Sequence, residues 1–88
     1  MKSRTTKTFW RHFDDLSDAT RRQAIRGYLL RRDDPWHQSL HFKCVSDKHG
    51  VWSVRVGIHW RALGTRDGDT LTWFWIGSHA GYDRLIGT

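Results

Sequence analysis

The segment 51–56 alternates apolar and polar side chains, with the period of two that is typical of a strand with one buried face. Trp52, Val54 and Val56 share the apolar side, and Arg55 lies on the polar side. Similar reasoning predicts further strands at 40–45, 60–64 and 71–76. The last of these, LTWFWI, is almost entirely apolar, so we expect a central strand that is covered on both faces.

Short polar segments separate these strands. Asp67-Gly68 is a strong hairpin signal, because glycine readily adopts the positive φ that a two-residue turn requires. The segment 46–50, SDKHG, predicts a turn between the first two strands. Consecutive strands joined in this way indicate an antiparallel meander of four strands.

The N-terminal half shows helical spacing instead. Phe9, Phe13 and Leu16 recur at intervals of four and three residues, which places them on one face of a helix. Ser17 is a good N-cap for a second helix that begins at Asp18. The two helices would form a hairpin whose apolar face packs on the later strands.

The second helix is apolar on one side and strongly basic elsewhere. The side that we expect to be buried consists of Ala24, Ile25, Tyr28 and Leu29. The basic remainder consists of Arg21, Arg22, Arg26, Arg31 and Arg32. Gly27 predicts close packing, because glycine inside a helix costs about 1 kcal/mol relative to alanine. Pro35 ends the helix, since the residue before a proline avoids the helical conformation.

Together these elements predict an α+β fold, in which an N-terminal helical hairpin packs on a four-stranded, mainly antiparallel twisted sheet. Eighty-eight residues suffice for one domain, 1–88. Residues 1–8 are polar and basic, and the sequence leaves open whether they form a short edge strand or a disordered arm. Residues 78–88 form a short tail, in which Tyr82, Leu85 and Ile86 can fold back on the sheet.

Charge narrows the choice of partners. Fifteen Lys and Arg residues against nine acidic residues give a formal net charge of +6 and a pI near 10.3. Such an excess predicts attraction to polyanions, nucleic acid first, unless the basic side chains form only a solvated surface. The single cysteine, Cys44, excludes an internal disulfide, and its place on the apolar side of its strand predicts a buried thiol. The sequence shows neither a signal-peptide pattern nor a membrane-spanning apolar run, so we expect a cytoplasmic protein without membrane contact.

Metal and cofactor chemistry have little support in the sequence. The six histidines form no pair with metal-site spacing, and there is no cysteine cluster. The eight glycines are scattered at turns instead of forming a phosphate-binding loop. We therefore expect neither a metal nor a cofactor.

Six side chains in the predicted strands and the tail remain as candidates for chemistry. They are Lys43, Arg55, Arg61, His79 and Tyr82, with His41 as an outlier that shares the polar side of the first strand with Lys43. Side chains on one face of neighbouring strands lie within about 5 Å of each other, so this set can converge. It suits RNA cleavage by the 2′-hydroxyl of the RNA itself. A guanidinium would stabilise the charge on the phosphate, and an imidazole would exchange protons near neutral pH.

Each of these side chains also has a structural interpretation. Arg55 and Arg61 could lie on a solvated face, and Lys43 could be an ordinary edge lysine. His79 alone would be a surface or capping histidine, and Tyr82 alone would pack the tail. The hypothesis of a catalytic site therefore depends on their convergence.

The order of a helical hairpin and a sheet, and the spacing of motifs, resemble the RelE/ParE superfamily of small bacterial toxins from toxin–antitoxin pairs. The resemblance is carried by SLHFK at 39–43, WSVRV at 52–56, HWRAL at 59–63 and WIGSH at 75–79, followed by Tyr82. These stretches span most of residues 9–86, and their spacing makes the match specific.

The resemblance implies a toxin that a cognate antitoxin neutralises with an acidic or amphipathic segment laid over the sheet and helices. For RelE-like members it implies metal-independent endoribonuclease activity on mRNA at the ribosome, which inhibits translation. Arg61 matches the family's strand arginine, whereas Ser53 departs from the basic pattern of its strand. His79 and Tyr82 match the positions after the last strand where RelE-like toxins carry a basic residue or histidine and a tyrosine. The resulting assignment is Arg61, His79 and Tyr82 to catalysis and Lys43, Arg55 and His41 to RNA binding.

Two other functions remain open at this point. ParE-like relatives share the fold and inhibit DNA gyrase without this RNA chemistry. A non-toxic relative would act only as a protein- or RNA-binding module. The fold does not decide among these functions. The tryptophan-rich surface would also suit a homodimer.

Overall fold

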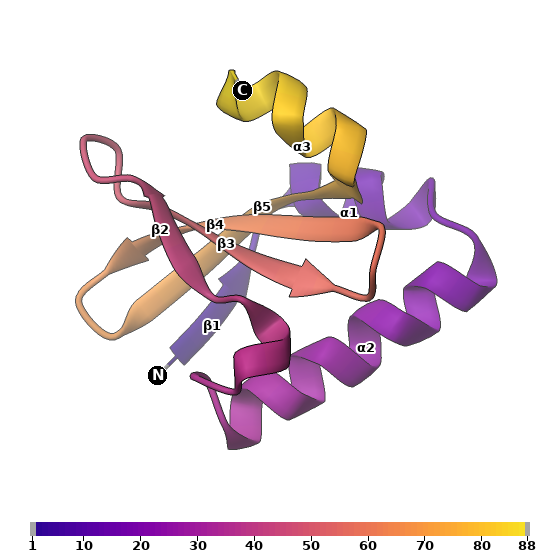
Figure 1. Cartoon of the computed structure of the whole chain (residues 1–88), viewed down its shortest axis with the longest axis horizontal. Helices are drawn as coiled ribbons and strands as arrows, with labels where there is room; N and C mark the ends of the chain where they lie inside the picture. The colour runs from indigo at the N-terminus through magenta and orange to yellow at the C-terminus, as the bar shows by residue number, and fades with distance from the viewer. Residues whose placement is uncertain (1, 88) are drawn as a thin grey trace.

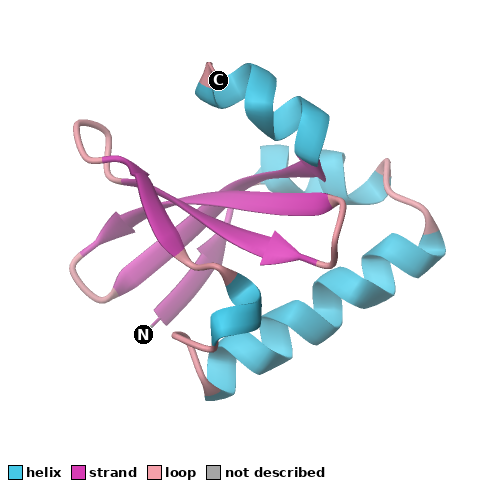
Figure 2. Ribbon diagram, viewed as in Figure 1, coloured by secondary structure: helices cyan, strands magenta, loops and turns pink. Residues whose placement is uncertain are grey.

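The computed structural model describes residues 2–87, which form helices packed on a mixed sheet (Figure 2). In chain order, the elements are β1 (Lys2–Thr5), α1 (Lys7–Asp14), α2 (Asp18–Asp33), the 3-10 helix η1 (Gln38–Leu40), β2 (Lys43–Ser46), β3 (Val51–Val56), β4 (Trp60–Asp67), β5 (Thr70–Ser78) and α3 (His79–Ile86). The predicted α+β class and the helical hairpin are confirmed.

The sheet contains five strands in the order β1-β5-β4-β3-β2, and β1 runs parallel to β5 (Figure 1). The predicted count of four strands was wrong, because residues 2–5 add an edge strand along the first half of β5. The Lys2 N–H donates to the Asp69 carbonyl at 2.7 Å, and the Thr6 N–H donates to the Trp73 carbonyl at 3.0 Å. The alternative left open for the N-terminus is thus decided in favour of a strand, with Met1 lying outside the described residues.

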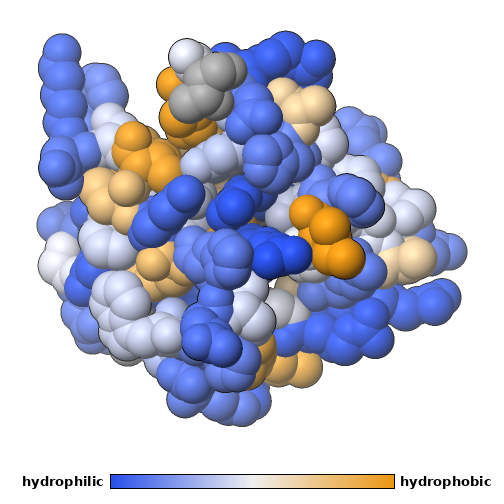
Figure 3. Space-filling view, in the orientation of Figure 1, coloured by the Kyte–Doolittle hydropathy of each residue, from blue (hydrophilic) through white to orange (hydrophobic). Residues whose placement is uncertain are grey.

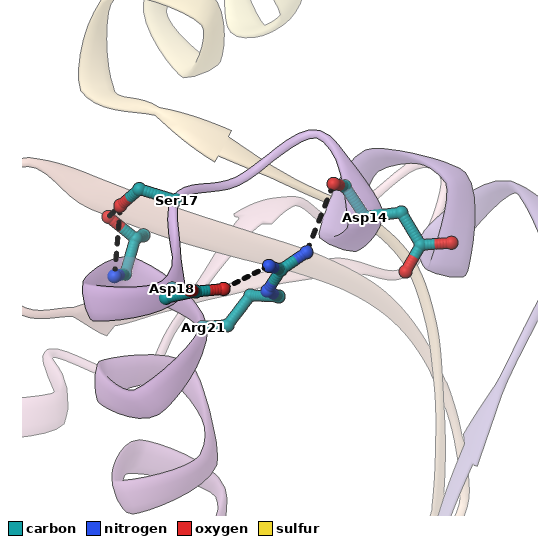
Figure 4. Close-up of polar contacts among 5 residues, drawn as sticks. Asp14, Ser17, Asp18 and Arg21 are labelled. Carbon is teal, nitrogen blue, oxygen red and sulfur yellow. Dashed lines mark hydrogen bonds and ion pairs between the residues drawn. The ribbon is translucent and has the colours of Figure 1, made fainter.

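Local contacts fix the corner between α1 and α2, as Figure 4 shows. The Ser17 hydroxyl accepts a hydrogen bond from the Thr20 N–H at 3.2 Å, so the predicted N-cap is confirmed. Arg21 donates to the carbonyl of Asp14 at 3.2 Å and pairs with the carboxylate of Asp18. These contacts span few residues, which explains why the sequence pattern could reveal this corner.

The core lies between the helical hairpin and one side of the sheet, which we call the hairpin face. Its sheet residues are Val54, Val56, Ala62, Leu71, Trp73 and Ile76, and they meet Phe9, Phe13 and Leu16. A bulge after Leu63 places Gly64 opposite Trp73. A Cβ at position 64 would lie 2.9 Å from the indole, so glycine allows the ring to enter the core.

The orientation of α2 differs from the prediction. Its apolar side chains are largely accessible: Ile25 is 52% exposed, Tyr28 49% and Leu29 41%. Arg31, which we expected on the solvated side, is only 3% exposed. Its guanidinium lies 5.0 Å from the Phe42 ring and 5.2 Å from the Trp73 ring, and burial lowers its pKa. The aromatic surface of the sheet therefore attracts an arginine in place of the aliphatic residues.

The strand predicted at 40–45 begins later than expected. Leu40, predicted as the first residue of that strand, instead ends η1, and His41 follows with a left-handed φ of 45°. The expectation that His41 shares a strand face with Lys43 was therefore wrong. The prediction of a buried thiol was wrong: Cys44 is half-buried and outside the core, and its thiol donates to the Asp47 carboxylate at 3.2 Å. That hydrogen bond raises the pKa of the Cys44 thiol.

The prediction that β5 is covered on both faces was also wrong, although the strand lies inside the sheet. Leu71, Trp73 and Ile76 are buried, whereas Phe74 and Trp75 are half-buried. The side opposite the hairpin, which we call the α3 face, is covered by α3 near the C-terminal end of β5 (Figure 1). A single short helix leaves part of this face accessible.

The C-terminal tail folds back, as expected, but as a helix. The Ser78 hydroxyl accepts from the Gly81 N–H at 3.1 Å and begins α3, and Gly87, with a φ of 82°, ends it. Among residues 2–87, no helix combines the length and apolar character needed to cross a bilayer. The surface in view in Figure 3 is mainly hydrophilic, with small, separate apolar patches.

Candidate active site

Arg61 lies on the α3 face, in the middle of the sheet. The antiparallel register places it opposite Arg55 on β3 and Gly77 on β5. Gly77 makes room for the neighbouring indole of Trp75, since a Cβ there would lie 2.5 Å from the ring. Tyr82 of α3 covers the arginine, whose side chain is left only 8% exposed.

The Arg61 guanidinium is buried without a hydrogen-bond acceptor. Its Nε and Nη1 are both buried, and neither has a hydrogen-bond partner among the described residues. The Tyr82 ring lies 5.2 Å from its Cζ, a cation–π contact that offsets part of the desolvation. A buried charge without a counter-ion is costly. This position is therefore suited to an incoming anionic group.

His79 lies beside this pair at the first position of α3. Its ring is 5.8 Å from the Tyr82 ring, at an angle of 62°. Its Nδ1 is 3.1 Å from Oδ2 of Asp83, one helical turn later. The His79 side chain is 50% exposed, so the imidazole can exchange protons with solvent or substrate. The structure thus brings together Arg61, Tyr82 and His79.

Of the three side chains predicted to bind RNA, two lie on the same face as Arg61 and one does not. Arg55 lies opposite Arg61, but its Nε donates to a backbone carbonyl of the following turn at 3.1 Å. Lys43 is exposed on the edge strand, on the same face and opposite Ser53. His41 is exposed before the strand begins, so the fold does not bring it to this set.

Ser53 is fully buried on β3, at the position where the sequence departs from the basic pattern. Its hydroxyl also has no hydrogen-bond partner among the described residues. Complete burial explains why a small side chain stands here, because a long basic one would require space that the sheet and its cover occupy. The α3 face therefore buries two polar side chains with unpaired atoms, Ser53 and Arg61.

A groove of about 520 Å³ opens on the hairpin face, between α1, α2 and the sheet. Apolar side chains dominate its lining, among them Phe9, Trp10, Phe13, Ile25, Tyr28 and Val54. Arg4 and Arg31 also border it. A second hollow of about 610 Å³ lies between the α1–α2 corner and α3. Arg61 lines neither of these two hollows, and its 8% exposure makes it the covered part of the candidate active site.

Metal ligands are not gathered in the part of the chain that the structure describes. No three His, Cys or Asp side chains among residues 2–87 lie in a group that could hold an ion.

Comparison with known proteins identifies the family. A family model described as the ParE-like toxin domain matches residues 18–84. The chain belongs to this family. No curated protein sequence matches it. The resemblance to the RelE/ParE superfamily of toxins from toxin–antitoxin systems is thereby confirmed.

Solved structures support the fold of this ParE-like toxin domain. A chain of the RelB–RelE antitoxin–toxin complex from Methanococcus jannaschii has a TM-score of 0.73 and 16% identity, over 93% of this chain and 96% of the other. A chain of the RelBE2 toxin–antitoxin complex from Mycobacterium tuberculosis has a TM-score of 0.67 and 19% identity, over 89% and 96%. A chain of the DinJ–YafQ complex from E. coli has a TM-score of 0.64 and 14% identity, over 91% and 94%. At these identities the similarity shows the fold alone.

Sequence reasoning missed two charged residues of this ParE-like toxin domain. Asp83 follows His79 by four residues, so its contact would have been visible once the tail was read as a helix capped by Ser78. The burial of Arg31 has no such signal, because it depends on rings from distant parts of the chain, Phe42 before β2 and Trp73 in β5.

Proposed function

We propose that this ParE-like toxin domain is the toxin of a toxin–antitoxin pair that cleaves mRNA at the ribosome in the cytoplasm. The observation that carries the proposal is the buried guanidinium of Arg61, whose Nε and Nη1 have no hydrogen-bond acceptor within residues 2–87, beside Tyr82 and His79. An RNA phosphate that displaces the Tyr82 ring would meet two donor nitrogens, Nε and Nη1 of Arg61. Its non-bridging oxygens match the planar fork of a guanidinium.

The proposed reaction is an internal phosphoryl transfer in the RNA. The 2′-oxygen bonds to phosphorus while the bond to the 5′-oxygen breaks, which gives a 2′,3′-cyclic phosphate and a free 5′-hydroxyl. Arg61 stabilises the negative charge on the phosphate, and His79 accepts the 2′ proton or donates one to the leaving 5′-oxygen, while water carries the other of these two protons. Tyr82 holds the guanidinium in place until the RNA arrives, and no metal or cofactor takes part.

Two further basic side chains extend this surface. Lys43 and Arg55 lie on the same sheet face as Arg61 and would contact flanking phosphates. His41 lies outside the strand and has no part in the proposed site.

The apolar groove on the hairpin face is the proposed binding site for the antitoxin. Trp10, Ile25 and Tyr28 line it and remain about half exposed. Arginine side chains border the same groove, so an amphipathic segment with acidic residues would match both its apolar lining and its charge. The RelB–RelE and RelBE2 structures are of toxin–antitoxin complexes, which supports a partner of this kind.

The decisive experiment is to express the protein alone in bacteria and to map the 5′ ends of ribosome-bound mRNA. We expect new ends inside translated codons, and we expect Arg61→Ala to abolish both these ends and the growth arrest. Arg84→Ala is the matched control, because it removes the same charge from an exposed position on α3. Equal cleavage by the Arg61→Ala variant would contradict the proposed role of this arginine.

The match to a ParE-like domain favours a second candidate, inhibition of DNA gyrase. A supercoiling assay with purified gyrase tests it directly. Inhibition of supercoiling together with intact mRNA would replace the nuclease proposal. Normal growth with neither effect would identify a non-toxic relative.

A further inference from the structure

We infer that Asp83 is a positioning residue for His79. The Asp83 carboxylate holds the imidazole so that one defined nitrogen faces the substrate. The effect on the reaction rests on the proposed nuclease function, whereas the contact itself does not. The observation is the 3.1 Å approach of Oδ2 of Asp83 to Nδ1 of His79.

Two hydrogen bonds fix the backbone at the start of α3, independently of the His79 side chain. The His79 N–H donates to the carbonyl of His59 at 2.7 Å, which ties the start of α3 to the turn between β3 and β4. The Ser78 hydroxyl caps the same helix through the Gly81 N–H. Only the side-chain torsions of His79 therefore remain to be fixed.

Two neighbours restrict those torsions in the free protein. Tyr82 packs edge-on against the imidazole, with ring centroids 5.8 Å apart. Asp83 lies four residues after His79, the spacing at which side chains meet on one face of a helix. It is also the only acidic residue in the sequence of α3. No other residue of this helix could accept a charge-assisted hydrogen bond from the ring.

The carboxylate also selects the tautomer. An ionised carboxylate only accepts hydrogen bonds, so its partner Nδ1 must carry a hydrogen. In the neutral ring Nε2 is then the unprotonated nitrogen, available to exchange a proton with the RNA. A neutral imidazole in water prefers the opposite tautomer, with the hydrogen on Nε2. Asp83 thus imposes the form that can act as a base through Nε2.

The contact contributes to function more than to stability. Both side chains are partly solvated, with exposures of 50% for His79 and 42% for Asp83. Exposed ion pairs add little to folding. We therefore expect loss of Asp83 to alter the imidazole and leave the thermal midpoint of unfolding unchanged.

The first test is 15N NMR of the histidine rings in the full-length protein, at a pH where the rings are neutral. His79→Gln assigns the His79 signals by their loss. We expect the Nδ1–H tautomer in the unsubstituted protein and predominantly Nε2–H in Asp83→Ala. Asp33→Ala is the matched control, because it removes an exposed helical carboxylate that is ion-paired with Arg32, and it should leave the His79 tautomer unchanged.

The second test measures cleavage on ribosomes. Asp83→Ala should lower the maximal rate on the order of tenfold, at unchanged half-saturation by ribosomes, since orienting partners of catalytic or ligating histidines have effects of this size or larger. Asp83→Glu retains the carboxylate and should recover part of the rate, and Asp33→Ala should cleave normally.

The outcomes separate the two hypotheses. An Nε2–H tautomer in the unsubstituted protein, or an unchanged tautomer in Asp83→Ala, would overturn the role of Asp83. If Asp83→Ala changes the tautomer of His79 but cleaves RNA at the normal rate, Asp83 has no role in the reaction. A changed tautomer in a protein that cleaves no RNA would refute the proposed function and leave the orienting contact established.

Discussion

On the hairpin face apolar side chains remain exposed, whereas on the α3 face polar side chains are buried. The hairpin face contacts α1 and α2, yet Ile25 and Tyr28 of α2 are about half exposed. The α3 face lies under a single short helix, yet it buries Arg61 and Ser53. Exposed apolar clusters and buried polar groups are the informative exceptions in a protein surface.

The two faces therefore suit partners of different chemistry. Covering apolar side chains stabilises by about 25 cal/mol per Å² removed from water, so the hairpin face benefits from any well-fitting apolar segment. The α3 face gains from charge, because a buried guanidinium needs an anion. Substitutions on one face should therefore leave the function of the other intact.

The largest expected effect comes from Arg61→Met, which replaces the buried charge with an apolar chain of similar length. We expect cleavage to fall on the order of 100- to 1,000-fold, as when an electrostatic stabiliser is removed from an active site. The free energy of unfolding should rise by about 1 kcal/mol or more, because no ion pair is broken. Urea denaturation beside the ribosome assay measures both, and a less stable variant would show that Arg61 supports the fold.

A smaller effect is expected from Ile25→Ser in the groove. Binding of an antitoxin encoded beside the toxin gene should weaken by about 10- to 100-fold, the loss typical of a central apolar contact. Calorimetric titration measures this, and mRNA cleavage by the free toxin should not change. Ile58→Ser is the control, because Ile58 is 71% exposed and lies outside the groove. Equal weakening by both variants would contradict the assignment of the groove.

The smallest effect is expected from Gly27→Ala in α2. The sequence suggested close packing at this glycine, but a Cβ there would meet no atom within 4 Å. Alanine should therefore raise the free energy of unfolding by about 0.5 to 1 kcal/mol through helix propensity alone. Thermal unfolding measures the change. A decrease would mean that α2 lies closer to the sheet than this open groove implies.

The features that the sequence revealed depend on near neighbours. Alternation located β3, and the Asp67-Gly68 signal marked the hairpin whose Gly68 has a φ of 58°. Ser17 is the N-cap of α2, because its hydroxyl accepts a hydrogen bond from the Thr20 N–H. In each case the determining contacts lie within a few residues along the chain, so pattern and propensity suffice.

The remaining features depend on distant parts of the chain. Arg31 is buried because Phe42 and Trp73 provide rings for its guanidinium. The helical periodicity of α2 cannot predict these contacts, because both rings lie outside the helix. His41 leaves the predicted strand because a short 3-10 helix forms before it. The site was predictable as far as strand parity aligned Arg55 with Arg61, but burial of the latter required knowing that the tail forms a helix above it.

The position of β5 has a consequence for biosynthesis. This strand is made late, yet it separates β1 from β4 and also supports α1. β1 must therefore remain unpaired until β5 has been made, after the other three strands of the sheet. A nascent chain that stops before β5 should therefore be sensitive to protease, because both β1 and α1 lack the strand on which they pack.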